Sequence, residues 1–336
     1  MIDWKFVQQM IANADRILLT THENPDGDGI GCASAMQYYL QDIGKDSRIL
    51  CTSELPYEYG FFQHAKDYSL YSKTKHAEWI AGADLAIVFD VGDFSRLRGI
   101  GEQLKINGIK TLNIDHHIHA SNGNFTYDLI DLKAAATGEM LYDFFKTIYQ
   151  GQLPLAIAEG IYTAILTDTG SFRYSNTNQH CHAIAIECIN AGIKPHDIYQ
   201  QVYESSSIAR VKLLGAILND INFDFNGELA WFQIDQSMLD RCSASRSDVD
   251  GFTDFIRTIR GVEIALMIFQ NGADSCRINF RSKGKYNIHS VAQEMGGGGH
   301  PFAAGAVVAG SLDVVTEKVL QATIKSLNSQ NGNMQQ

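Results

Sequence analysis

The chain has 336 residues, of which 45% are hydrophobic and 19% charged, and its formal net charge is −11. This composition excludes a disordered or fibrous chain, and at roughly 150 residues per domain the length predicts about two domains. The negative charge excludes a chain-wide basic surface for long duplex nucleic acid. Residues 1–250 carry 19 basic and 32 acidic side chains, whereas residues 251–336 carry 8 and 6. The C-terminal part is therefore better suited to bind an anion.

Targeting segments and cysteine pairs are not indicated. No apolar run approaches the ~20 residues that a membrane span needs, and Met1–Lys5 lacks the basic start and apolar core of a signal peptide. We therefore expect a cytoplasmic protein with no membrane partner. The six cysteines are scattered without a CxxC pair, which favours buried or free thiols over a zinc ribbon or a disulfide framework.

The first half alternates short apolar runs with amphipathic stretches, as parallel strands joined by helices do. Four runs predict strands: Arg16–Thr21, Ser47–Cys51, Leu85–Asp90 and Thr111–Asp115. A helix is predicted over Gly29–Leu40, between the first two strands. This order predicts an α/β fold, a mostly parallel sheet with covering helices.

The pattern then becomes helical, and after it changes again to apolar alternation. Helices are predicted over Gly138–Tyr149, Ala156–Thr167, Gln179–Ala191, Pro195–Tyr203 and Ile208–Leu218. Strands at Leu229–Ile234, Val262–Phe269 and Cys276–Arg281 follow, with helices near Ser247–Thr258 and Asn287–Met295. We therefore expect a first domain over residues 1–192, a helical linker over 193–218, a smaller α+β domain over 219–328 and a disordered tail over 329–336.

Acidic and histidine residues stand where the predicted strands end, which is where open α/β sheets bind ligands. His22, Asp26 and Asp28 follow the first strand. Carboxylates two residues apart, between glycines, can face two neighbouring cations, although an acidic turn is the ordinary alternative. Asp90 ends an apolar strand, a costly place for an unpaired charge, so it is either a ligand or a helix cap. Asp93 is the better candidate for the cap.

Two further clusters follow the same placement. In Asp115-His116-His117, adjacent histidines point to different sides, so that one can bind a metal while the other faces substrate. A solvated histidine pair is the alternative. Asp168 ends a predicted helix just before Gly170, where it supplies another oxygen ligand or only marks the helix end.

The combined set contains carboxylates and imidazoles without a thiolate: His22, Asp26, Asp28, Asp90, His116 and Asp168. Such ligands favour Mn²⁺, or Mg²⁺, over structural zinc, and they are too many for one ion. Two ions about 3.5–4 Å apart activate a bridging water and neutralise the oxygens of a displacement at phosphorus. The sequence therefore predicts a two-metal phosphoesterase.

The second domain contains a candidate anion site. Arg281 and Ser282 precede a run of four glycines that ends at His300. Glycines let backbone N–H groups approach an anion closely, and the guanidinium and imidazole add donors. The glycines interrupt a compact segment, which argues against a flexible linker. We expect the substrate contacts to be Arg281, Ser282, Gly297, Gly298, Gly299 and His300.

These motifs, in this order and over nearly the whole chain, resemble the DHH phosphoesterase family, named for Asp115-His116-His117, with its C-terminal DHH-associated domain. The branch it resembles is the nanoRNase/pAp phosphatase, or bifunctional oligoribonuclease, type. The resemblance implies hydrolysis of short oligoribonucleotides to mononucleotides and of 3′-phosphoadenosine 5′-phosphate (pAp) to AMP, usually with two Mn²⁺ ions. The implied partners are short single-stranded RNA and small phosphorylated nucleotides.

The resemblance also implies roles for single residues. One metal falls on His22, Asp26 and Asp90, and the other on Asp28, Asp90, His116 and Asp168, with Asp90 bridging. His117 is implied to contact substrate or leaving group, with Asp115 as the carboxylate that orients it. Asp254 stands where the family often has asparagine, and its charge would alter substrate preference if it touches substrate.

Other functions remain open from the sequence. The same metals serve a phosphodiesterase for cyclic dinucleotides or their linear products. A nucleotide-sensing module on a degenerate scaffold should have lost ligands, yet all six are present. An inorganic pyrophosphatase fits the first domain but leaves the glycine-rich domain poorly explained. The sequence does not give the physiological substrate, the cleavage polarity, the native metal or whether the chain is a dimer.

Overall fold

The computed structural model describes residues 2–62, 67–117, 124–272 and 274–334. The chain forms two compact units, Met1–Ser205 and Ser206–Gln336. The boundary falls inside the stretch that the sequence predicts as a helical linker. Two predicted helices of that stretch exist, but α8 (Pro195–Tyr203) lies in the first unit and α9 (Ile208–Asn219) in the second.

The first unit is built on a parallel sheet, as predicted. Its strand order is β3-β2-β1-β4-β5-β6, and every neighbouring pair is parallel. The strands are β1 (Arg16–Thr21), β2 (Asp46–Cys51), β3 (Tyr68–Leu70), β4 (Leu85–Phe89), β5 (Lys110–Asp115) and β6 (Tyr127–Ile130). The edge strands β3 and β6 were not predicted, because they are short and only partly buried. In register, Thr21 faces Phe89 and Phe89 faces Ile114, so β1, β4 and β5 end at one edge of the sheet.

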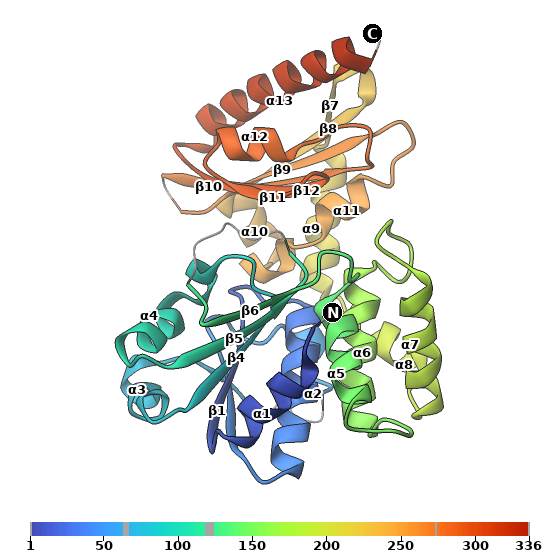
Figure 1. The fold of residues 1–336 in the computed structure, drawn as a ribbon. Coiled ribbons are helices and arrows are strands. Elements are labelled where there is room, and N and C mark those ends of the chain that lie inside the picture. The colour runs from blue at the N-terminus through green and yellow to red at the C-terminus, as the bar shows by residue number, and fades with distance from the viewer. Residues whose placement is uncertain (1, 63–66, 118–123, 273, 335–336) are drawn as a thin grey trace. The chain divides into compact units, whose positions relative to one another are not determined.

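Helices cover both faces of this sheet (Figure 1). Side chains alternate along each strand, so Leu19 packs with the helices α1, α2, α5 and α6 while Leu18 packs with α3 and α4. These helices, with α7, are α1 (Trp4–Ala12), α2 (Gly27–Asp42), α3 (Lys73–Ala81), α4 (Arg98–Ile106), α5 (Thr137–Lys146), α6 (Leu155–Asp168) and α7 (Gln179–Asn190). The sheet with its covering helices confirms the predicted α/β class.

Helices α2 and α6 touch at their backbones. A Cβ at Gly31 would clash with the carbonyl oxygen of Gly160, and a Cβ at Gly160 would clash with that of Gly31. Nearer the start of α2, a Cβ at Gly27 would lie 2.6 Å from the side chain of Thr167. Only glycine permits this approach. It brings the first turn of α2 beside the last turn of α6.

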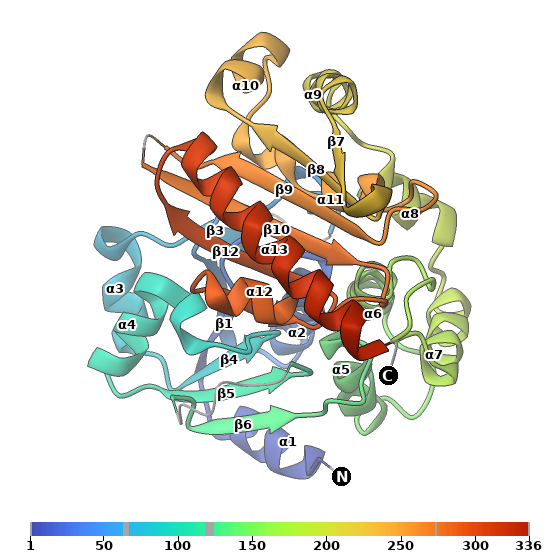
Figure 2. The same ribbon diagram turned by 90° about the horizontal axis from the view of Figure 1, so that it is seen from above.

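The second unit has a mixed sheet of order β11-β12-β10-β9-β8-β7, in which only β8 and β9 are parallel. Its strands are β7 (Asn222–Asp224), β8 (Leu229–Ile234), β9 (Ile264–Gln270), β10 (Ser275–Ser282), β11 (Gly298–His300) and β12 (Ala303–Ala309). One face packs on α12 (His289–Glu294) and α13 (Leu312–Met334), which runs across the sheet in Figure 2. The other face packs on α9, α10 (Gln236–Cys242) and α11 (Phe252–Ile256).

Two predictions differ from the second unit as observed. The helix predicted over Ser247–Thr258 is broken, because Gly251 adopts φ +81° between the turn Arg246–Val249 and α11. The tail predicted as disordered from residue 329 is helical to Met334, where α13 ends. Side chains hold this polar end: Gln330 accepts from the Asn287 N–H at 2.9 Å, and Asn331 accepts from the Tyr286 hydroxyl at 2.9 Å.

Within the described ranges, none of the helices combines the length and apolar character that crossing a bilayer requires. All six cysteines are free and buried, in agreement with the sequence prediction.

Candidate active site

The six residues predicted as metal ligands come together at the sheet edge where β1, β4 and β5 end. Three groups of side chains place a ligand atom from each member within 4.8 Å of the others: His22, Asp26 and Asp90; Asp28, His116 and Asp168; and Asp90, His116 and His117. The strand ends supply the histidines and Asp90, while α2 and α6 supply the other three carboxylates. One edge of the sheet thus concentrates four carboxylates and three imidazoles.

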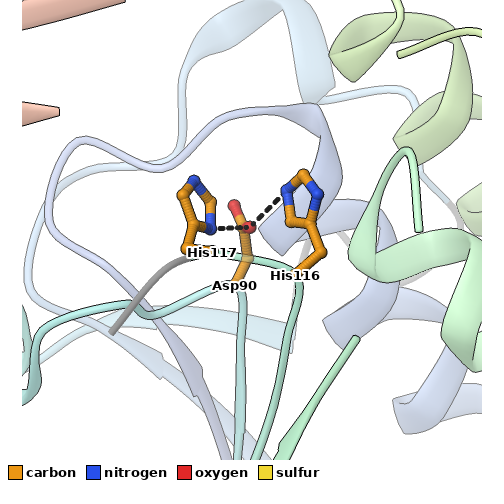
Figure 3. A group of neighbouring side chains, drawn as sticks. All are labelled: Asp90, His116 and His117. Atoms are coloured by element: carbon orange, nitrogen blue, oxygen red, sulfur yellow. Dashed lines mark ion pairs between the residues drawn. The ribbon is translucent and has the colours of Figure 1, made fainter. Parts of the chain in front are cut away.

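Asp90 lies at the centre of the cluster (Figure 3). Its Oδ2 lies 3.3 Å from His22 Nε2, and its Oδ1 lies 3.5 Å from His116 Nε2 and 3.3 Å from His117 Nδ1. The residue is 2% exposed and has φ +62°, a left-handed conformation that costs free energy for a residue other than glycine. Both oxygens of a single, strained carboxylate are therefore turned toward different histidines.

His116 has a nitrogen that faces carboxylates without a hydrogen bond. Its Nδ1 lies 3.2 Å from the carbonyl oxygen of Ala134, so in the neutral ring Nδ1 carries the proton and Nε2 keeps its lone pair. That Nε2 atom is buried without a hydrogen bond, 3.6 Å from Asp168 Oδ2 and 3.8 Å from Asp28 Oδ2. Once a cation displaces the proton that the carboxylates favour on Nε2, this imidazole nitrogen and the carboxylate oxygens around it match the donor set of a divalent cation.

The second histidine of this kind is His22, which is 3% exposed. Its Nε2 lies 3.8 Å from Asp26 Oδ2 and 3.3 Å from Asp90 Oδ2. Its Nδ1 lies 2.8 Å from the carbonyl oxygen of Glu23, to which it donates in the tautomer that leaves the Nε2 lone pair for a cation. The Arg96 guanidinium, 2.8 Å from the same Nδ1, could donate to it only in the other tautomer. The ring is thereby fixed from behind, with Nε2 directed at the two carboxylates.

Backbone N–H groups orient the carboxylates on α2. Asp26 caps the helix, because its Oδ1 accepts from Asp28 N and Gly29 N at 3.1 and 3.3 Å. Asp28 is fully buried, and its two oxygens accept from Thr137 N and Gly138 N at 2.7 and 2.8 Å. These donors begin α5, where the helix dipole also favours a negative charge.

The two catalytic residues predicted beside the metal ligands are His117 and Asp115. His117 Nδ1 lies 2.8 Å from Asp115 Oδ1, and Asp115 is fully buried. The imidazole is therefore held by a carboxylate at one nitrogen, while a quarter of its side chain is exposed.

Asp93, predicted as a cap, accepts from Ser95 N at 2.9 Å at the start of the turn Phe94–Leu97, which confirms that prediction.

The clustered charges and the burial of this site shift the pKa values of its histidines and aspartates. Burial lowers the pKa values of the imidazoles, but the neighbouring carboxylates outweigh it and raise His22 and His116 to about 10 and His117 to about 11. Burial raises the pKa of Asp168 to about 7, with His116 lowering it and Asp90 raising it. Burial, then the Asp90 charge, raises the pKa of Asp28 well above its usual value. Protons balance the excess negative charge, and bound cations would displace them.

The last two glycines of the glycine run in the second unit lie in a strand that was not predicted from the sequence. Gly298, Gly299 and His300 form β11, which pairs with β12 across a two-residue turn. A Cβ at Gly297 would clash with the carbonyl oxygen of Gly305, and Gly299 has φ +131°. By contrast, a Cβ at Gly298 meets nothing within 4 Å. At least two of the glycines thus serve close packing of the hairpin.

The other predicted substrate contacts lie at the end of β10. Arg281 Nε lies 3.4 Å from Asp254 Oδ2, and Asp254 Oδ1 lies 3.2 Å from Arg257 Nη2. The residue that departs from the family pattern therefore pairs with two guanidiniums. Ser282 is 1% exposed, and its hydroxyl accepts from Gly284 N at 3.2 Å, whereas His300 is exposed.

Sequence reasoning missed the residues that hold the ligands from behind. These are Thr137, Gly138, Glu139 and Asn176. A Thr-Gly-Glu run at a helix start is a weak signal for exposed N–H groups. Arg257 was missed as well, because nothing in its local pattern shows that it shares Asp254 with Arg281.

Known proteins resemble the whole chain. The model of the DHH family, N-terminal domain, matches residues 16–165, and that of the DHHA1 domain matches residues 237–330. The bifunctional oligoribonuclease and PAP phosphatase NrnA of Thermus thermophilus is 28% identical, covering 93% of this chain and 90% of that protein. NrnA of Bacillus subtilis is 29% identical, covering 88% and 90%. A crystal structure of an exopolyphosphatase-related protein from Bacteroides fragilis has a TM-score of 0.89 at 22% identity, covering 99% and 97%.

Proposed function

Because this chain belongs to the DHH family, we propose that it is a two-metal phosphoesterase that hydrolyses short oligoribonucleotides to mononucleotides and pAp to AMP. The observation that carries the proposal is the buried Nε2 of His116, which has no hydrogen bond and lies 3.5 Å from Asp90 Oδ1 and 3.6 Å from Asp168 Oδ2. The substrate classes come from the relatives, which are named oligoribonucleases and PAP phosphatases and align over most of their length. We propose that the enzyme acts in the cytoplasm, as its relatives are bacterial enzymes named for RNA and nucleotide substrates.

The ligand sets are part of the proposal. One cation would be held by His22, Asp26 and Asp90, and the other by Asp28, Asp90, His116 and Asp168. Mn²⁺ suits carboxylate and imidazole donors, and Mg²⁺ is the alternative. Two bound cations would lower the pKa of a bridging water and neutralise charge on the phosphate.

The protein's own groups have separate tasks. Asp115 accepts the Nδ1 proton of His117 and so fixes the ring orientation. We propose that the other side of this imidazole donates to the phosphate or leaving-group oxygen, where negative charge develops. A proton on His117 at neutral pH agrees with this role, since the Asp115 and Asp90 carboxylates raise its pKa.

In the second unit, we propose that Arg281, His300 and the backbone of Gly298 and Gly299 bind a phosphate or nucleotide end. The N–H of Gly297, also predicted as a contact, instead donates to the carbonyl oxygen of Ala292 at 2.8 Å. The guanidinium of Arg281 is one-third exposed, and Asp254 is its carboxylate partner. An anionic ligand can replace that carboxylate. Ser282 contributes through the turn that it fixes, since its hydroxyl is buried against Gly284 N.

A single set of assays tests the function. Purified protein with Mn²⁺ is given pAp, RNA of two to twenty nucleotides, and cyclic and linear diadenylate. We expect cleavage of pAp and of the shortest RNAs, with turnover falling as the chain lengthens. Faster turnover of cyclic diadenylate than of its linear product would instead make the enzyme a cyclic dinucleotide phosphodiesterase. Hydrolysis of none of these compounds would overturn the proposal.

A further inference from the structure

One short segment contacts three of the candidate metal ligands from behind. This ligand-holding segment, Ala134–Gly138, leads into α5. Its first carbonyl oxygen lies 3.2 Å from His116 Nδ1. The N–H groups of its last two residues donate to the two oxygens of Asp28 at 2.7 and 2.8 Å, and its threonine hydroxyl lies 3.4 Å from Asp90 Oδ1. The position of the segment therefore determines the relative placement of these ligands.

Two side chains hold the segment at Ala135. Glu139 Oε2 accepts from Ala135 N at 2.7 Å, and Asn176 Nδ2 donates to the Ala135 carbonyl oxygen at 3.0 Å. The same amide nitrogen of Asn176 lies 3.1 Å from the carbonyl oxygen of Asp168 and 3.4 Å from its Oδ2. Asn176 thus connects the segment to a fourth candidate ligand.

Burying the Glu139 carboxylate costs free energy of folding, which points to a role for the hydrogen bonds that it makes. The residue is 8% exposed, and apart from Ala135 N its donors are the Asn178 amide at 3.3 Å and the Cys181 thiol at 3.7 Å. In the described ranges, no lysine, arginine or histidine forms an ion pair with it. Removing a carboxylate from water without a cation is expensive, and an apolar residue would fill the space at lower cost.

We propose that Glu139 and Asn176 are positioning residues that, through the ligand-holding segment, set the cation affinity of the site formed by Asp28, His116 and Asp168. The inference rests on the metal site of the proposed function. No hydrogen bond among the described residues joins the segment to His22 or Asp26, so the cation site on those two residues depends on it only through the shared Asp90.

Calorimetric titration of the metal-free protein with Mn²⁺ tests this without any substrate. Glu139→Ala and Asn176→Ala each weaken one class of Mn²⁺ site about 10- to 100-fold, the range for residues that orient metal ligands. The other class changes much less. Glu139→Gln, which keeps an acceptor for Ala135 N, recovers part of the loss. The matched controls are Asp143→Ala on the exposed side of α5 and Ser175→Ala beside Asn176.

The outcomes separate the two proposals. Wild-type protein that binds Mn²⁺ in two classes, with Glu139→Ala and Asn176→Ala equal to their controls, overturns the inference alone. Wild-type protein that binds no divalent cation overturns the proposed function and the inference with it. If Glu139→Ala does not fold, Asn176→Ala decides the question, since Asn176 is exposed and its control shares the same loop.

Discussion

The two candidate binding regions of the molecule differ in how much of their support comes from the backbone. In the first unit, Asp26 and Asp28 accept from backbone N–H groups of helix starts, and His116 is held by a backbone carbonyl. In the second unit, Arg281 and Asp254 meet only as partly exposed side chains on β10 and α11. A side-chain substitution can shift these backbone groups but cannot delete them, whereas it deletes a side-chain pair outright. We therefore expect the first region to determine turnover and the second to adjust affinity.

The largest expected effect comes from removing the shared carboxylate. Asp90→Ala should lower kcat for a labelled RNA dinucleotide on the order of 10⁴-fold. When several residues act together in catalysis, removing one of them loses nearly the whole effect. Rate measurement at saturating Mn²⁺ checks this. The control Asp143→Ala changes an exposed carboxylate in the same unit and should leave kcat unchanged. An active Asp90→Ala enzyme would refute the two-metal site.

Asp115→Asn tests the positioning of His117 next. The amide keeps the shape of the carboxylate but loses its charge, so the imidazole is held less firmly and its pKa falls. We expect kcat for the labelled RNA dinucleotide to fall about 100-fold, within the range for groups that orient an active-site histidine. Mn²⁺ affinity, measured by calorimetry, should change little. A large loss of metal binding would show that Asp115 supports the metal ligands rather than His117.

For the second unit, a substitution at Gly298 separates charge from shape. Gly298→Asp should raise KM for pAp roughly tenfold through like-charge repulsion, with kcat and Mn²⁺ affinity nearly unchanged. Gly298→Ala is the matched control, because a Cβ at this position meets nothing within 4 Å. Equal KM values for pAp in the two variants would show that β11 does not contact substrate.

The smallest expected effect is at Asp254. Asp254→Asn frees Arg281 and Arg257 from their shared carboxylate, and we expect KM for pAp to fall about two- to fivefold, the scale of a partly exposed ion pair. Asp250→Asn, which breaks the neighbouring pair with Arg277, is the control. A rise in KM for Asp254→Asn would mean that the carboxylate itself contacts substrate.

The sequence predicted the first region better than the second. Apolar runs located β1, β4 and β5, and the charged residues at their ends became neighbours because parallel strands end at one edge. The contact between His116 Nδ1 and the carbonyl oxygen of Ala134 could not be predicted, because every residue has a backbone carbonyl and no residue type signals this contact. In the second unit, the glycine run resembles a loop, and its pairing with β12 depends on small residues such as Gly305 that lie next to it only in the folded chain.

The glycine contact between α2 and α6 has a consequence for metal choice. Asp28 stands in the first turn of α2 and Asp168 ends α6, so the separation of these carboxylates follows the distance between the two helix axes. At Gly31 and Gly160 the two backbones are so close that a Cβ added to either glycine would clash with the carbonyl oxygen of the other. A methyl group at either glycine would push the two helices apart and so increase the separation of Asp28 and Asp168, two ligands of the proposed cation site. If the proposed site binds a divalent cation, the ionic radius that it prefers would then depend partly on helix packing, with every ligand retained.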